Sequence, residues 1–150
     1  LYTGFSRVCR MVSKNIINYL GLTHHYGDIN CITILAHFYK QELKSNVFDN
    51  LFKTIKNDNK NITTRKWMKQ ISLSNIDNWA KSCAIKVTLT DAENYDVIVF
   101  RSLRGDNPIH FGMYIHHMRM FHLEEGGRSM ITNIDNYWSD RIHAIYRQVV

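Results

Sequence analysis

The chain has 150 residues, of which 45% are apolar and 21% charged, and its formal net charge is +6 at pH 7. This length predicts one domain over residues 1–150 with its own core, and the composition is that of an ordinary globular protein. No apolar run reaches the length of a membrane span, and charges interrupt the first fifteen residues, where a secretory signal peptide needs an apolar core. The positive charges are dispersed, so we expect a solvated basic surface and no nucleic-acid partner.

Apolar residues recur at helical spacing through the first half of the chain, and no repeat or low-complexity segment marks a second domain. The pattern predicts packing helices that are separated by polar loops. The predicted segments are a helix over residues 6–20, a short helix over 47–55, a solvated loop over 56–61, a helix capped by Thr63 or Thr64 that carries Trp67, and a helix that begins at Asn75.

Cysteine occurs at Cys9, Cys31 and Cys83, and this odd count without paired spacing indicates free thiols. Cys31 stands apart because it follows Asn30, a natural N-cap, at the start of a segment with a helical apolar stripe. Backbone N–H groups and the positive end of the helix dipole favour a thiolate in that first turn. A cysteine on an apolar helix is commonly a small core residue, but this position leads us to expect a reactive thiol, partly ionised near neutral pH.

From Val87 onward the apolar period changes from that of a helix to that of a strand. Helices followed by antiparallel strands predict an α+β fold in which the N-terminal helices pack on a C-terminal antiparallel sheet. The predicted strands cover residues 97–101, 109–115, 118–123, 128–132 and 142–147, with Tyr137 and Trp138 between the last two.

Residues 109–123, IHFGMYIHHMRMFHL, predict a hairpin with its bend at His116 and His117. His110 and His122 are separated by an even number of residues (122 − 110 = 12). In a hairpin centred on His116 they lie directly opposite each other, and cross-strand partners share a face of the sheet. The sequence therefore predicts two neighbouring imidazoles.

Two further residues complete the predicted arrangement. Gly112 lies between the histidines on the same face and would leave room for another group to approach. Cys31 is the nucleophile that the chain offers. If the three side chains act together, the face that bears His110 must meet Cys31, at least at the start of the strand, with the sulfur within about 4 Å of a ring nitrogen.

The order of these features resembles the NlpC family of cell-wall cysteine peptidases, which are papain-like enzymes. The matching residues are Cys31 in DINCITIL, His110 in HFGMY, and His122 in MFH. The strand YDVIVF before the first histidine and the closing segment YWSDRIHAIYR also resemble the family. The resemblance runs from Leu22 onward, is loose over the helical middle, and implies a papain-like NlpC-type fold.

The chain departs from the family at residues 30–33, where it has Asn-Cys-Ile-Thr and the family usually has Asp-Cys-Ser-Gly. The family tyrosine that lines the site falls at His24 or is replaced by Tyr26, and Asn30 is a further site-lining candidate. These traits resemble the NlpC-type domains of phage tail tips. The resemblance thus implies a location in the virion tail, action on the bacterial cell wall, and other phage tail proteins as partners.

By the same resemblance, the protein is a cysteine endopeptidase that cleaves peptidoglycan stem peptides next to D-glutamate. Cys31 is then the nucleophile, His110 holds and transfers the proton, and His122 orients His110. No cofactor is implied. The alternative is a catalytically silent NlpC-like structural module of a phage tail.

A metal site is a third interpretation, built from His110, His122 and either Cys31 or the His116–His117 pair. The chain lacks a short-spaced ligand pair such as HExxH or CxxC, so we expect no metal. The other histidines are expected to be structural or surface residues; they are His25, His37, His143 and, apart from the resemblance, His24.

Overall fold

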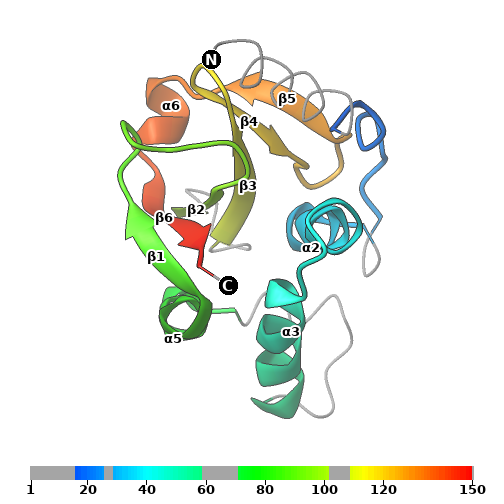
Figure 1. Cartoon of the computed structure of the whole chain (residues 1–150). Coiled ribbons are helices and arrows are strands. Elements are labelled where there is room, and N and C mark those ends of the chain that lie inside the picture. The colour runs from blue at the N-terminus through cyan, green and yellow to red at the C-terminus, as the bar shows by residue number, and fades with distance from the viewer. Residues whose placement is uncertain (1–15, 26–28, 59–70, 102–108, 150) are drawn as a thin grey trace.

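The computed structural model describes residues 16–25, 29–58, 71–101 and 109–149. These residues form the α+β fold that the sequence predicted, with helices before a sheet of six strands that are all paired antiparallel (Figure 1). The helices are α2 (Cys31–Glu42), α3 (Val47–Asp58), α5 (Leu73–Cys83) and the short α6 (Asn136–Ser139). No helix in this part of the chain is long and apolar enough to cross a membrane.

The sheet has the strand order β1-β6-β2-β3-β4-β5. The second and third strands have the predicted bounds, the last three differ from prediction by one or two residues at an end, and the first was not among the predicted strands. The strands are β1 (Ala84–Val87), β2 (Val97–Arg101), β3 (Ile109–Ile115), β4 (Arg119–His122), β5 (Met130–Asn133) and β6 (Ile142–Gln148).

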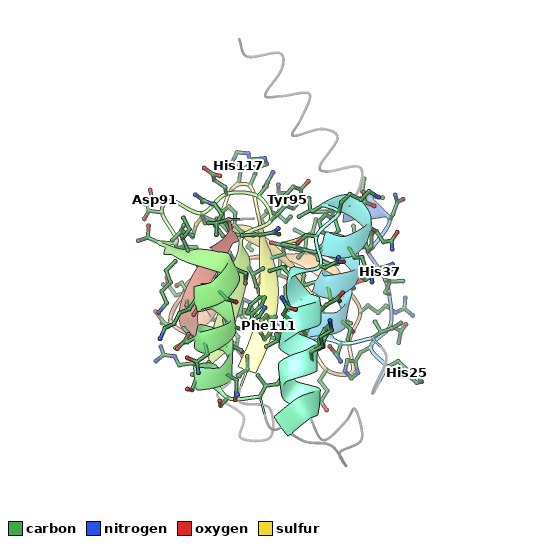
Figure 2. The ribbon with its side chains drawn as sticks, turned by 60° about the horizontal axis from the view of Figure 1, so that its bottom comes forward. His25, His37, Asp91, Tyr95, Phe111 and His117 are labelled. Atoms are coloured by element: carbon green, nitrogen blue, oxygen red, sulfur yellow. The ribbon has the colours of Figure 1, made fainter. Side chains whose placement is uncertain are left out.

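The two faces of the sheet are covered by different elements. Phe111 and Met113 of β3 and Phe121 of β4 point to the face on which α2, α3 and α5 pack, and all three side chains are fully buried. In Figure 2, Phe111 lies between α3 and α5. The opposite face carries Phe100 and Met120, which pack with Trp138 of α6 and other apolar residues. Figure 1 accordingly shows α2 and α6 on opposite sides of β3 and β4.

Three helices differ from their predicted extents. α3 continues through residues 56–58, which were predicted as loop, because no glycine or proline interrupts the helix there. α5 begins at Leu73 instead of Asn75, since the Ser72 hydroxyl caps it by accepting from the backbone N–H of Asn75 at 3.1 Å. Of the helix predicted over residues 6–20, only Ile16 and Ile17 are described and helical. The predicted helix with Trp67 lies outside the described residues.

Strand β1 begins at Ala84, directly after α5, three residues before the predicted change of period. Its pairing with β6 runs from Ala84–Gln148 to Val87–Ile145. The strand lies at the edge of the sheet and has exposed side chains at its centre, so backbone pairing rather than an apolar pattern defines it.

Candidate active site

The start of α2 is held by a reciprocal cap. The Asn30 side chain accepts hydrogen bonds from the backbone N–H groups of Ile32 and Thr33, both at 3.0 Å. The Thr33 hydroxyl in turn accepts from the backbone N–H of Asn30 at 2.9 Å. This capping box fixes Cys31 in the first helical turn, as the sequence predicted. Asn30, a candidate site-lining residue, is itself buried and bonded to its own helix.

The thiol of Cys31 is buried, with 7% of the residue exposed. Burial raises its pKa to about 11, although backbone N–H groups of Phe111, Cys31 and Ile32 lie close enough to stabilise the thiolate. The Glu125 carboxylate raises the pKa further. The predicted partial ionisation near neutral pH is therefore wrong for this state, because the loss of solvent outweighs the helix-terminal donors.

The hairpin has a register two residues away from the predicted one. Gly112 pairs with His122, and Ile115 pairs with Arg119, so the turn comprises residues 116–118. His110 and His122 are consequently diagonal neighbours and not direct partners. A shift of two residues keeps both side chains on one face, so the predicted pair of imidazoles still forms.

A chain of hydrogen bonds links the two imidazoles to β5. His110 Nε2 lies 2.9 Å from His122 Nδ1, and His122 Nε2 lies 2.8 Å from the Thr132 hydroxyl. If His122 donates to Thr132, its Nδ1 accepts from His110, which leaves His110 Nδ1 as a free acceptor. This is the tautomer in which His110 can take a proton from a nucleophile.

Both imidazoles are neutral at pH 7. Burial, with a smaller contribution from neighbouring His122, lowers the pKa of His110 to about 3. Burial lowers the pKa of His122 to about 4, and its side chain has no exposed surface. Together with the buried Cys31, the site rests as a thiol and two neutral rings rather than as a thiolate–imidazolium pair.

The apolar stripe of α2 and the His110 side chain lie on opposite faces of the sheet. The apolar stripe of α2 packs with Phe111, whereas His110 contacts Phe100 at a ring-centroid distance of 5.9 Å on the other face. The α2 stripe therefore does not meet the His110 face, and the expected meeting of Cys31 with that face is left to the start of β3. Alternation along β3 places its large apolar side chains on the helical face, and these bury the α2 stripe.

The meeting point of α2 and the histidine strand lies beyond the end of β4. Pairing of β3 with β4 stops at Gly112–His122, so the first three residues of β3 extend past that ladder. Here the Phe111 backbone N–H approaches the Cys31 thiol. Within the described residues no hydrogen bond joins Cys31 to His110. The Cys31 thiol instead lies close to the backbone N–H of Phe111, the residue that follows His110.

Gly112 does not leave the predicted space between the histidines. A Cβ atom built on Gly112 would lie 3.0 Å from Met120 Sδ and 3.3 Å from Phe100 Cε2. Both side chains are fully buried on that face. The absence of a side chain at Gly112 thus serves close packing, not the approach of another group.

Trp138 of α6 is a neighbour of the site that the sequence reasoning did not assign to it. Its ring centroid lies 5.6 Å from that of His110 and 5.1 Å from that of His122. The one sequence signal for Trp138 was the YW pair in the closing, family-like segment. Trp138 contacts residues of three strands that are far apart in the chain, and such contacts leave no periodic pattern in the sequence.

The structure places the remaining histidine and tyrosine candidates as follows. The His24 backbone N–H donates to the Gly127 carbonyl at 2.9 Å, and Tyr26 lies outside the described residues. His25 and His37 are exposed on the outer side of the helical layer (Figure 2). In the part of the chain that the structure describes, no group of three or more His, Cys, Asp or Glu side chains could hold a metal.

No protein-family model matches the sequence, and no curated protein matches it either. Among solved structures, the fold is similar to that of a protein described as similar to lipoprotein, NLP/P60 family, from Staphylococcus aureus subsp. aureus Mu50. The TM-score is 0.57 and the sequence identity is 14%. The match covers 96% of this chain and 42% of that protein, so the chain spans less than half of its length. The likeness confirms the predicted NlpC-type α+β fold.

Proposed function

We propose that the protein is a cysteine endopeptidase that cleaves peptidoglycan stem peptides. The observation that carries the proposal is the hydrogen bond of 2.9 Å between His110 and His122, which is continued to Thr132. An imidazole oriented by a second polar side chain, next to a cysteine at a helix start, is the arrangement that thiol peptidases use. The similarity of the fold to an NLP/P60 family protein supports the cell-wall substrate.

In the proposed reaction, the thiol of Cys31 turns from the Phe111 N–H to the free ring nitrogen of His110 and transfers its proton there. The sulfur then attacks the carbonyl carbon of the peptide bond, and the acyl group becomes bonded to sulfur. His110 gives the proton to the leaving amine, and water later releases the acyl group. His122 keeps the His110 ring in orientation through the hydrogen bond at Nε2.

The backbone N–H of Cys31, in the first turn of α2, is the proposed donor to the oxyanion that forms during attack. The first turn of a helix has N–H groups without partners in the helix, and its dipole favours negative charge. The Asn30 cap occupies the N–H groups of Ile32 and Thr33 and leaves that of Cys31 out of the capping box.

The proposal extends to a phage tail as the location, with other tail proteins as partners and with cleavage next to D-glutamate. Its support is the resemblance to tail-tip domains of the NlpC type, which rests on residues 30–33, on His24 or Tyr26 at the position of the family tyrosine, and on the short connection from there to Cys31. The net charge of +6 suits a substrate that carries free carboxylates.

A catalytically silent structural module is the second candidate, and two observations favour it. The pKa of Cys31 is raised to about 11 by burial, and no hydrogen bond joins its thiol to His110 among the described residues. A site that never brings the two groups together would keep the fold without the reaction.

Purified sacculi distinguish the two candidates. Wild-type protein should release muropeptides whose masses show cleavage beside D-glutamate, whereas Cys31→Ala and His110→Asn should release none. Cys83→Ala is the matched control, since Cys83 lies at the end of α5 and bonds to the Trp79 carbonyl at 3.4 Å. No release by the wild type supports the structural module, and equal release by Cys31→Ala contradicts the thiol mechanism.

A further inference from the structure

Trp138 covers the two histidines on the face of the sheet opposite to the α2 stripe. Its ring stacks at a tilt of 32° on His110 and stands nearly edge-on, at 79°, to His122. The Phe100 ring lies 5.2 Å from the Trp138 ring and also contacts His110. One indole thus contacts both partners of the His110–His122 hydrogen bond and the aromatic side chain beneath it.

The short helix α6 holds this indole in place. Asp135 caps α6, and the Trp138 backbone N–H donates to the Asp135 carbonyl at 3.1 Å and to its side chain at 3.3 Å. Arg141 donates to the Tyr137 carbonyl at 2.9 Å, and its guanidinium lies 3.3 Å from the centroid of the Tyr137 ring. Contacts at both ends of α6 therefore fix Trp138 between β5 and β6.

We propose that Trp138 is a positioning residue that excludes water from the His110–His122 hydrogen bond and holds the two rings in their relative orientation. The inference deepens the proposed function, because a positioned His110 is what that reaction needs. It stands on geometry: an aromatic ring in contact with both imidazoles, anchored by a capped helix.

Among the described residues, the groups that contact the two imidazoles carry no charge. The contacts of the two rings are Phe100 from β2, Thr132 from β5 and Trp138 from α6. Neither imidazole takes part in an ion pair within the described residues. Removal of water is therefore the main reason that both rings stay neutral, and opening the cover should let them accept protons more easily.

The test is a titration of the imidazoles by NMR in protein labelled at histidine. The variants form a graded series, Trp138→Phe, Trp138→Leu and Trp138→Ala, which uncovers the pair progressively. We expect little change for Phe, which keeps a ring, and a rise in the pKa of at least one imidazole by about one unit for Leu or Ala. Nitrogen shifts should also show a loss of the single tautomer that the hydrogen-bond chain selects.

Trp79→Leu is the matched control. Trp79 is also half of an aromatic contact, with Phe48 at 5.3 Å, and its indole N–H donates to the Val47 carbonyl, but it lies on the helical face of the sheet. This variant should lose stability without moving the titration of His110 or His122. An equal rise in the control, or unchanged titration in the folded Leu and Ala variants, overturns the proposal. Each folded member of the series gives a result, so one variant that does not fold does not end the test.

The titration needs no turnover and so separates the inference from the proposed function. If the Trp138 variants shift the pKa of an imidazole but the wild-type protein leaves sacculi intact, the shielding by Trp138 is supported and the peptidase reaction is contradicted. If the wild type hydrolyses sacculi and the variants show no change in imidazole pKa, only the shielding by Trp138 is contradicted. Where both hold, Trp138→Leu should move the acid limb of kcat/KM to higher pH, since His110 must be neutral to take the proton, and should change KM little.

Discussion

The position of Cys31 has two opposite effects on the pKa of its thiol, and the larger effect decides whether the thiol is ionised. The cap at Asn30 provides backbone donors near the sulfur, but burial dominates and raises the pKa to about 11. A helix start lowers the pKa of an exposed cysteine, but here the apolar stripe that predicts α2 also buries the first residue of the helix.

Glu125 offers a way to change this balance with one substitution. Burial is the main cause of the raised pKa of Cys31, and the Glu125 carboxylate adds to it. We expect Glu125→Gln to lower that pKa by about half a unit, because a nearby negative charge disfavours the thiolate. The pH dependence of iodoacetamide labelling at Cys31 measures this. Glu124→Gln, the exposed neighbour, is the control and should leave the profile unchanged.

Thr132 should matter for stability through a single hydrogen bond. Its hydroxyl lies 2.8 Å from Nε2 of His122, whose side chain has no access to solvent. Thr132→Val keeps the shape and leaves that nitrogen without a partner, so we expect a loss of about 1–2 kcal/mol in the free energy of unfolding in urea. Thr132→Ser should restore most of it, and a Val variant as stable as wild type would mean that the ring finds another partner.

At the scale of the elements, the sequence was most informative where local pattern and packing agree. The bounds of β2 and β3 and the start of α2 at Cys31 were correctly predicted from apolar runs and a cap. The register of the β3–β4 hairpin was not, because it depends on where the turn is centred, which is His117 and not His116. Residues 116–118 form a three-residue turn with His117 and Met118 at φ of 65° and 56°, and no glycine announces those angles.

Substitution by glycine should change the free energy of unfolding in opposite directions at a methionine in this turn and at one in a strand. Met118 is exposed at positive φ, where glycine is favoured, so Met118→Gly should raise the free energy of unfolding by about 0.5 kcal/mol. Met130 is also exposed but lies in strand β5, where glycine is unfavourable, so Met130→Gly should lower the free energy of unfolding by about 0.5–1 kcal/mol. Thermal unfolding of both variants checks the contrast, and a loss in both would mean that strain in the turn is negligible.

At the scale of the whole molecule, the apolar stripe of α2 packs on the face of the sheet opposite to the one that carries the histidines. Sequence alternation correctly divided β3 into two sets of side chains but could not say which set the helices would cover. That choice depends on the summed apolar contacts of three helices, which no local pattern contains. The same lack of information explains why Met120 over Gly112 and Trp138 over the histidines were not foreseen.

The buried histidines predict how stability depends on pH. Their folded pKa values of about 3 and about 4 lie below the ordinary value of 6.5, so the unfolded chain binds more protons as the pH falls below 6.5. Their contribution is complete above that pH and is lost between about pH 6.5 and 3. We expect His122→Asn to flatten the fall in unfolding free energy over this range by about 1–3 kcal/mol. His37→Asn, on the exposed face of α2, should keep the wild-type slope.

The three-residue turn of the hairpin has a consequence for recognising distant relatives. In a hairpin without a bulge, two residues face the same way when their spacing has the opposite parity to the number of turn residues. Three turn residues therefore require an even spacing, as His110 and His122 have, and a two-residue turn would require an odd one. A search pattern that fixes twelve residues would miss homologues with a shorter or longer bend. A pattern that ties the parity of the histidine spacing to the number of turn residues would retain these homologues and reject chance pairs of histidines.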